Sequence, residues 1–278
     1  ALPEAYKAKL MELSNINEND ELPVVLSEEH LKKAMSDVFA TFQDECDVDY
    51  EETVMKRVHE MKREMEESTG EELDDIPMPA DAGTTSTILV LNGDSLLVGW
   101  LGDSRAVLAR QEEDEGALIA APLTSDHNVN FIKKTPGSPE MQRMKPLEHE
   151  FFGNHLIVPQ ADGMIQVTRS LGDVPFHRSG VVTHEPDFFY SASVKELHAR
   201  FLIMASDGLW DHFTDNEAVR FLEEFIGEKP VTEGFLLEAI EAMENKAKEL
   251  AIANKAKRDD IVVFILYFKR KEPVLSVA

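Results

Sequence analysis

The sequence predicts an α+β fold in which β-sheets are covered by helices. The first 80 residues carry apolar positions at helical spacing, whereas the chain from Gly83 onward contains β-rich runs separated by turn residues. Two more helical segments lie between the last two predicted strands. Runs of strands with helices before and between them are typical of α+β proteins. The 278 residues are 43% hydrophobic, which is enough for a sizeable core.

Three helices are predicted in the N-terminal part of the chain. Ser27 is expected to cap the second helix, and Asp49 with Glu52 three residues later is expected to cap the third. The acidic, proline-containing stretch 66–80 predicts a loop, so we expect residues 43–80 to form a helical, acidic insert. The apolar faces of the three helices consist of Leu2, Tyr6, Leu10 and Leu13, of Leu31, Met35, Val38 and Phe42, and of Val54, Val58, Met61 and Met65.

The β-rich part is predicted to begin with a hairpin. Residues 85–91 and 95–101 are joined by Asn92-Gly93, two residue types that tolerate positive φ. Residues 105–109 are expected to continue the meander. Further strands are predicted over residues 155–158, 201–205 and 261–268.

Two helices are predicted before the last strand. Thr214 and Glu217 form a capping-box pattern ahead of an apolar stripe. A second helix is expected over residues 232–255, with Leu236, Ile240 and Met243 among its inward positions.

The composition is strongly acidic, with 53 Asp and Glu residues against 28 Lys and Arg residues and a net charge of −25. Such a surface repels nucleic acid. No stretch approaches the roughly 20 apolar residues of a membrane helix, and the N-terminus lacks the pattern of a signal peptide. A single cysteine, Cys46, excludes an internal disulfide and a cysteine-based zinc cluster. We expect a cytoplasmic or nuclear monomer that binds neither nucleic acid nor membrane.

Three aspartates stand at the ends of predicted strands. Asp103 follows residues 96–101, Asp207 follows residues 201–205, and Asp259 precedes the last strand. Strand ends hold a carboxylate rigidly at the rim of a sheet, where metal ligands can converge. Carboxylates suit hard cations such as Mg²⁺ or Mn²⁺. The alternative is that these residues only terminate strands, as Asp and Gly commonly do.

Other catalytic patterns are absent from the sequence. It contains no nucleophile elbow, no phosphate-binding loop of the Gly-x-x-x-x-Gly-Lys type and no His-Glu-x-x-His zinc helix. His127 and His212 each adjoin an aspartate, but residues adjacent in sequence seldom face one another, so we do not expect a proton relay.

Six short segments between residues 80 and 268 form a specific set. They are Ala82-Gly83-Thr84-Thr85-Ser86-Thr87, the stretch 98–108 around Gly102-Asp103-Ser104-Arg105, Leu123-Thr124-Ser125-Asp126-His127, Val167-Thr168-Arg169-Ser170-Leu171-Gly172-Asp173, Ala205-Ser206-Asp207-Gly208-Leu209-Trp210-Asp211 and Arg258-Asp259-Asp260-Ile261. In this order and spacing, they resemble the metal-dependent protein phosphatase 2C family.

The resemblance implies both a fold and a reaction. The fold is an α+β sandwich of two antiparallel β-sheets flanked by helices, in α-β-β-α layers. The reaction is hydrolysis of phosphoserine and phosphothreonine in phosphorylated protein substrates, by a water that two Mn²⁺ or Mg²⁺ ions activate. By matched position, Asp207 and Asp259 would be metal ligands, and Asp103 would correspond to an acidic residue of a third, weaker cation site. Arg169 and Asp173 match a motif that braces loops around the site.

The chain also departs from the family pattern. The family's Arg-x-x-Met-Glu-Asp and Asp-Gly-His-Gly-Gly motifs, which supply further metal ligands, do not occur in it. Asp260 and Val262 replace the usual Asn and small hydroxyl residue. The chain therefore resembles a single phosphatase 2C-like domain over residues 1–278 that is N-terminally incomplete, and we expect it to be inactive alone. Two hypotheses stay open: an active phosphatase with its other ligands upstream, and a catalytically inactive scaffold that binds protein partners.

Overall fold

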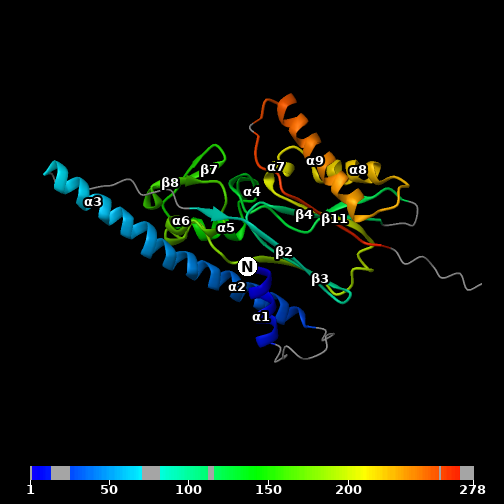
Figure 1. Ribbon diagram of the computed structural model, residues 1–278, viewed down its shortest axis with the longest axis horizontal. Coiled ribbons are helices and arrows are strands. Elements are labelled where there is room, and N and C mark those ends of the chain that lie inside the picture. The colour runs from blue at the N-terminus through cyan, green and yellow to red at the C-terminus, as the bar shows by residue number, and fades with distance from the viewer. Residues whose placement is uncertain (1, 14–25, 71–81, 112–115, 257, 270–278) are drawn as a thin grey trace, which may run out of the picture. The chain divides into compact units, whose positions relative to one another are not determined.

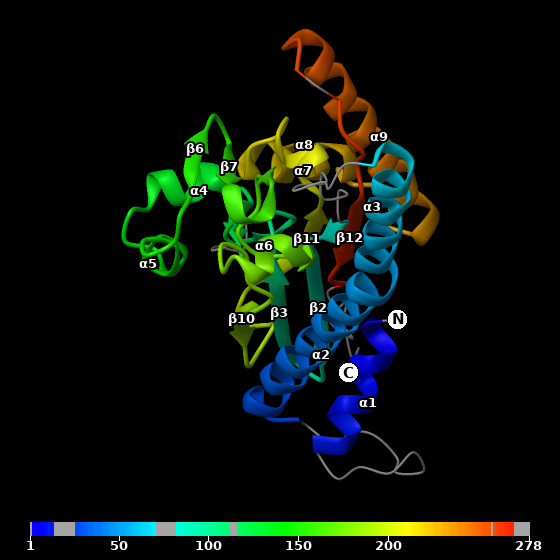
Figure 2. The same cartoon turned by 90° about the vertical axis from the view of Figure 1, so that its left-hand side faces the viewer.

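The computed structural model describes residues 2–13, 26–70, 82–111, 116–256 and 258–269 (Figures 1 and 2). The helices of these residues are α1 (Leu2–Leu13), α2 (Glu28–Asp49), the π-helix η1 (Tyr50–Met55), α3 (Lys56–Thr69), α4 (Val129–Lys134), α5 (Pro139–Met144), the 3-10 turn η2 (Pro159–Ala161), α6 (Val174–Arg178), α7 (Asp207–Trp210), α8 (Asp215–Ile226) and α9 (Glu233–Ala253). None of the helices described is long and apolar enough to cross a membrane.

The strands of the described residues form four sheets. They are β1 (Gly83–Thr84), β2 (Ser86–Asn92), β3 (Ser95–Leu101), β4 (Arg105–Arg110), β5 (Ile119–Pro122), β6 (Glu150–Phe152), β7 (His155–Val158), β8 (Gly163–Ile165), β9 (Leu171–Gly172), β10 (Asp187–Ser191), β11 (Ala199–Ala205) and β12 (Val263–Tyr267). The strand orders are β12-β11-β4-β5, β10-β3-β2, β6-β7-β8 and β1-β9. The first sheet, the third and the fourth are antiparallel throughout. Helices combined with antiparallel sheets confirm the predicted α+β class.

The chain divides into two compact units. The first unit contains Ala1–Ile88, Gly99–Asp103 and Asp126–Phe188, and the second contains Leu89–Val98, Ser104–Ser125 and Phe189–Ala278.

The N-terminal helices of the first unit pack through their apolar faces. Tyr6 of α1 is buried, and its hydroxyl donates to the Leu31 carbonyl oxygen of α2 at 3.0 Å. The predicted cap of α2 is confirmed, because the Ser27 hydroxyl accepts from the His30 amide. Further along α2, the Gln43 side chain is buried and bonds both the amide and the carbonyl oxygen of Gly172. The register of α2 against β9 is thereby fixed.

The predicted start of a third helix at Asp49 is wrong. Asp49 has helical backbone angles (φ −62°, ψ −39°) and makes no side-chain cap, and the chain runs on through η1 into α3 (Figure 1). No glycine or proline interrupts residues 28–69, so nothing breaks the helix. Residues 66–69, predicted as loop, are the last turn of α3, which ends at Gly70 with a φ of +72°. The rest of that predicted loop lies outside the described residues, and the insert at 43–80 stays a prediction.

A separate small core supports the rest of the first unit. Apolar side chains from α4, α5 and the β6-β7-β8 sheet bury one another there, with contributions from the segment after α6. The members with no more than 3% exposure are Val129, Ile132, Met144, Leu156, Val158, Val181 and Val182. This core anchors the loops that carry residues 126–128 and 166–170.

The second unit is built on the sheet β12-β11-β4-β5. Alternate residues of β11 and β4 pack with residues of helices α7, α8 and α9, because side chains on a strand alternate between its two faces. Phe201, Ile203 and Ala205 of β11 and Val107 and Ala109 of β4 form the sheet side of this core. The predicted C-terminal helices and strand are therefore confirmed, with α9 beginning after a Thr232 cap.

The predicted hairpin is confirmed with its turn shifted by one residue. Strand β2 extends through Asn92, and the two-residue turn is Gly93-Asp94. Gly93 has a φ of +64°, which explains the glycine.

Replacing Thr214 with alanine is expected to lower the free energy of unfolding by about 1 kcal/mol. The predicted capping box is present: the Glu217 amide donates to the Thr214 hydroxyl at 3.3 Å, and the Thr214 amide donates to the Glu217 carboxylate at 2.9 Å. Alanine leaves the Glu217 amide without this acceptor. Urea unfolding measures the loss. Asn216→Ala, in the same exposed turn, is the control and should cost less; an equal cost for both would contradict the capping role.

Candidate functional site

Asp207 and Asp259 approach one another in the second unit through contacts between the segments that carry them. Strand β11 ends at Ala205, and Asp207 is the first residue of α7. The Ser206 amide donates to the Val262 carbonyl oxygen at 3.0 Å, and the Val262 amide donates to the Ser206 hydroxyl at 3.0 Å. The Ser206 hydroxyl itself donates to the Asp260 carbonyl oxygen at 3.2 Å. These bonds tie residues 260–262 to the end of β11.

Gly208 permits this close approach. A Cβ atom at position 208 would lie 2.3 Å from the Asp260 carbonyl oxygen, which is far inside van der Waals contact. A side chain there would push the Asp260 backbone away from α7, and Asp259 with it. The glycine of the Ser206-Asp207-Gly208 segment is therefore a requirement of the packing beside the carboxylates.

The electrostatics of this pair favour a cation. Burial raises the pKa of the Asp207 carboxyl, and the negative charges of Asp259 and Asp211 raise it further. Asp259 accepts a hydrogen bond from the Asp260 amide at 2.8 Å. Carboxylates that repel one another in this way offer an all-oxygen donor set, which fits Mg²⁺ or Mn²⁺.

The departures from the family pattern at Asp260 and Val262 leave this arrangement in place. Both residues contribute main-chain atoms to the contacts with Ser206, so their side-chain types do not enter those bonds.

Asp103 belongs to the first unit, unlike Asp207 and Asp259. It follows Gly102, whose φ is +91° and whose position would bring a Cβ atom within 2.3 Å of the Thr85 side chain. One carboxylate oxygen of Asp103 accepts from the Asn128 side-chain amide at 3.1 Å. Of the three sequence-predicted metal residues, the structure thus brings Asp207 and Asp259 close to each other and holds Asp103 by a separate contact.

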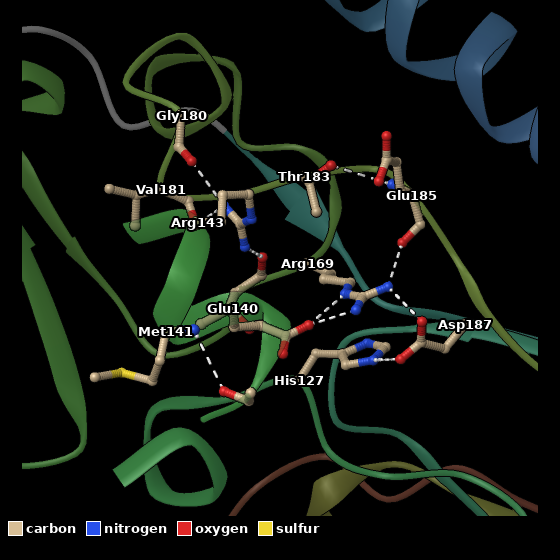
Figure 3. Close-up of polar contacts among 12 residues, drawn as sticks. His127, Glu140, Met141, Arg143, Arg169, Gly180, Val181, Thr183, Glu185 and Asp187 are labelled. Carbon is tan, nitrogen blue, oxygen red and sulfur yellow. Dashed lines mark hydrogen bonds and ion pairs between the residues drawn. The ribbon is translucent and has the colours of Figure 1, made fainter. Parts of the chain in front are cut away.

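An ion-pair network in the first unit was not predicted from the sequence (Figure 3). Three of its four members are buried, and the side chain of the fourth, Asp187, is 44% exposed. Arg169 donates from Nε to Glu140 at 2.9 Å, and its other nitrogens bond Glu140 and Asp187. The Nε2 atom of His127 lies 3.0 Å from the second oxygen of Asp187. The His127 ring also stacks on Trp100, with centroids 5.8 Å apart. We name His127, Glu140, Arg169 and Asp187 the buried network.

Charge compensation sets the protonation states in the buried network. Burial alone would raise the pKa of Glu140, but the hydrogen bond and charge of Arg169 outweigh it and hold the pKa below its usual range. Burial would also raise the pKa of Asp187, but hydrogen bonds and charges from His127 and Arg169 outweigh this effect and lower it. Burial lowers the pKa of His127 despite the bond to Asp187. The imidazole is therefore neutral near pH 7.

The buried network is an ion-pair site rather than a metal site. Ligand atoms of His127, Glu140 and Asp187 lie within 4.8 Å of one another, the one such group of three found among the described residues. The Arg169 guanidinium already pairs with both carboxylates, and a divalent cation placed there would face that positive charge. No local pattern of residues indicated this cluster, because its four members are spread over residues 127–187.

Arg143 extends the support around the buried network. Its guanidinium donates to the carbonyl oxygens of Gly180, at 2.7 Å, Val181 and Thr168, at 3.0 Å (Figure 3). It therefore links α5 to the main chain on both sides of Arg169.

Asp173 makes contacts of the bracing kind that the sequence predicted. Its carboxylate accepts from the Ser170 hydroxyl at 2.6 Å. It packs so tightly on Gly83 that a Cβ atom there would lie 1.9 Å from a carboxylate oxygen. Gly83 in turn pairs with Gly172 in the β1-β9 ladder.

Known proteins with similar sequences are described as protein phosphatases. The chain is 30% identical over 203 residues to "Protein phosphatase 1L" of Bos taurus, covering 72% of this chain and 52% of that protein. It is 31% identical over 217 residues to "Probable protein phosphatase 2C 78" of Oryza sativa subsp. japonica, covering 69% of this chain and 54% of that protein. The chain thus spans about half the length of these relatives.

A solved structure shares the fold. The crystal structure of a serine-threonine phosphatase 2C from Toxoplasma gondii aligns with 96% of this chain and 79% of its own, at a TM-score of 0.65 and 18% sequence identity. This likeness confirms the fold class. The family model described as "Protein phosphatase 2C" matches residues 24–259, and the chain therefore belongs to the protein phosphatase 2C family.

Proposed function

We propose that this chain is part of a metal-dependent phosphatase that hydrolyses phosphoserine and phosphothreonine in proteins. The observation that best supports the proposal is the pairing of Asp207 with Asp259 in a chain of the phosphatase 2C family. Burial and the negative charge of Asp259 raise the pKa of Asp207, and a divalent cation would neutralise the surplus of negative charge at this pair.

Two Mn²⁺ or Mg²⁺ ions are proposed to bind at Asp207 and Asp259, and a further, weaker one at Asp103. Two carboxylates are too few for two hard cations, which take about six oxygen ligands each. We propose that residues upstream in the same polypeptide supply the rest. When bound, such cations lower the pKa of a water and orient it for attack on phosphorus.

The contribution of this chain's own residues is preorganisation. The two hydrogen bonds between Ser206 and Val262 and the absence of a side chain at Gly208 hold the segments of both carboxylates in one arrangement. A site of this kind loses little entropy when the cations bind, because its ligands are already oriented.

The partners proposed are phosphorylated proteins. The net charge of −25 disfavours nucleic acid. We further propose a monomer in the cytoplasm or nucleus.

The test is Mn²⁺-dependent hydrolysis of an aryl phosphate and of a phosphothreonine peptide, by this chain and by the polypeptide with its upstream residues. We expect turnover that requires Mn²⁺ and stops in excess chelator, because the attacking water depends on the cation. We expect it only when the upstream residues are present. Turnover that persists in excess chelator would contradict the metal mechanism.

A second candidate is a catalytically inactive scaffold, and one observation favours it. Helix α3 buries none of its residues, and Met61 and Met65 are 42% and 45% exposed. An exposed amphipathic helix is a surface that a protein partner can bind. A well-folded polypeptide that has its upstream residues and shows no Mn²⁺-dependent turnover would favour the scaffold.

A further inference from the structure

Asn128 uses both ends of its side-chain amide. The oxygen accepts from the Phe131 amide at 3.0 Å and thereby caps α4, while the nitrogen donates to Asp103 at 3.1 Å. The two partners fix the orientation of the amide, because a backbone N–H needs an acceptor and a carboxylate needs a donor. An amide flipped by 180° would satisfy neither.

No other common capping residue can do both. Serine and aspartate cap helices as well as asparagine does. Serine is too short to reach beyond the cap and bears no amide, and aspartate would place a second negative charge against Asp103. The residue type at position 128 therefore matches the two contacts together, and the cap alone does not require it.

The backbone that carries Asn128 is held on several sides. The His127 amide donates to the Gly102 carbonyl oxygen at 3.0 Å, directly beside Asp103, and the His127 carbonyl oxygen accepts from the Thr168 amide at 2.8 Å. The His127 side chain is 2% exposed and belongs to the buried network. Asn128 is thus placed by a rigid support, and that support continues to the residue before Asp103.

We propose that Asn128 is a positioning residue that orients the Asp103 carboxylate for a divalent cation. The inference rests on the proposed function for the assignment of Asp103 as a cation ligand. Groups that hydrogen-bond a ligating carboxylate fix its orientation, and their loss commonly weakens metal binding by about 10–100-fold. Asn128 performs this task from the N-terminus of α4.

The experiment is a Mg²⁺ titration of the isotopically labelled polypeptide, with its upstream residues, followed by amide chemical shifts. The amides of Gly102 and Asp103 report the Asp103 site, and those of Gly208 and Asp260 report the Asp207–Asp259 pair. In Asn128→Ser, which keeps a cap, we expect half-saturation at Gly102 and Asp103 to need about 10–100-fold more Mg²⁺. The response at Gly208 and Asp260 should be unchanged.

Ser138→Ala is the matched control. The Ser138 hydroxyl caps α5 by accepting from the Met141 amide at 3.3 Å, a contact that does not involve Asp103. This variant should lower the melting temperature by about 2–4 °C and leave the Mg²⁺ response at Gly102 and Asp103 unchanged. Asn128→Ser should leave the melting temperature nearly unchanged and weaken the Mg²⁺ response at Gly102 and Asp103. In an Asp103→Asn background, Asn128→Ser should cause no further loss of Mg²⁺ response.

The outcomes separate this inference from the proposed function. An unchanged Mg²⁺ response in Asn128→Ser, or no response at Gly102 and Asp103 in the wild type, overturns the inference even if the polypeptide is an active phosphatase. A weakened response in Asn128→Ser supports it, even if the same polypeptide hydrolyses no phosphate ester. In that last case the proposed phosphatase function is wrong, and the positioning role of Asn128 is supported.

Discussion

Asp207→Asn is expected to abolish Mn²⁺-dependent hydrolysis while leaving the protein folded. An amide offers a cation one neutral oxygen in place of a charged carboxylate, and loss of a supporting contact alone commonly costs about 10–100-fold. We therefore expect a loss of at least about 100-fold in kcat/KM. The measurement is Mn²⁺-dependent turnover of an aryl phosphate by the polypeptide with its upstream residues.

The fold of the Asp207→Asn variant should not suffer without metal. Burial and the charges of Asp259 and Asp211 raise the pKa of Asp207, so the native state disfavours this carboxylate at neutral pH. Removing the charge should leave the melting temperature of the metal-free protein equal or higher. Asp162→Asn is the control, since Asp162 is exposed and has a φ of +47°, which asparagine tolerates. Wild-type turnover in folded Asp207→Asn would refute the assignment.

Arg169→Met is expected to lower the free energy of unfolding by about 3–5 kcal/mol. The Arg169 and Glu140 side chains are only 8% and 5% exposed, so solvent screens their pairing little. Methionine would fill much of the space but leave the Glu140 charge buried without its partner. Asp187 would lose Arg169 and keep His127 as a hydrogen-bond partner. Guanidinium unfolding measures the change.

Two controls distinguish a lost ion pair from a packing defect. In Arg169→Met with Glu140→Gln, no buried charge remains at position 140, so part of the stability should return. Acidification gives the second control. The wild-type pKa of Glu140 is lowered, so its contribution is present at neutral pH and is lost as pH falls through that value. In Arg169→Met the largest opposition to burial is lost and Glu140 protonates more readily, so the difference in unfolding free energy from wild type should narrow at low pH. A gap that is independent of pH would indicate packing instead.

Local sequence signals predicted the parts of the fold that local interactions determine. The caps at Ser27 and Thr214 were found because a capping side chain bonds an amide two or three residues away. The cap expected at Asp49 failed because the same Asp-x-x-Glu pattern is equally compatible with a helix interior. The helix continues through Asp49 because helix-compatible residues run without interruption on both sides of it.

The candidate site was predictable to the same extent. The positions of Asp207 and Asp259 at strand ends indicated that they could converge. The pairing of β11 with β12, which was not predicted, brings these strand ends together. The contact between Asn128 and Asp103 and the pairing of His127 with Asp187 were not predictable. They join residues 25 and 60 positions apart, and only the folded chain determines such neighbours.

The uninterrupted helix from Glu28 to Thr69 allows the packing of α2 to stabilise the helical conformation of α3. At 1.5 Å per residue it extends for about 60 Å. Starting a helix is costly and lengthening one is not, so α2, which is held by its packing on α1 and β9, nucleates the whole rod. Since no residue of α3 is fully buried, this helix persists mainly by propagation from the packed part of the continuous helix. The far end of α3 should therefore fray more easily with increasing distance from Tyr50 of η1, which is the last buried side chain of the continuous helix.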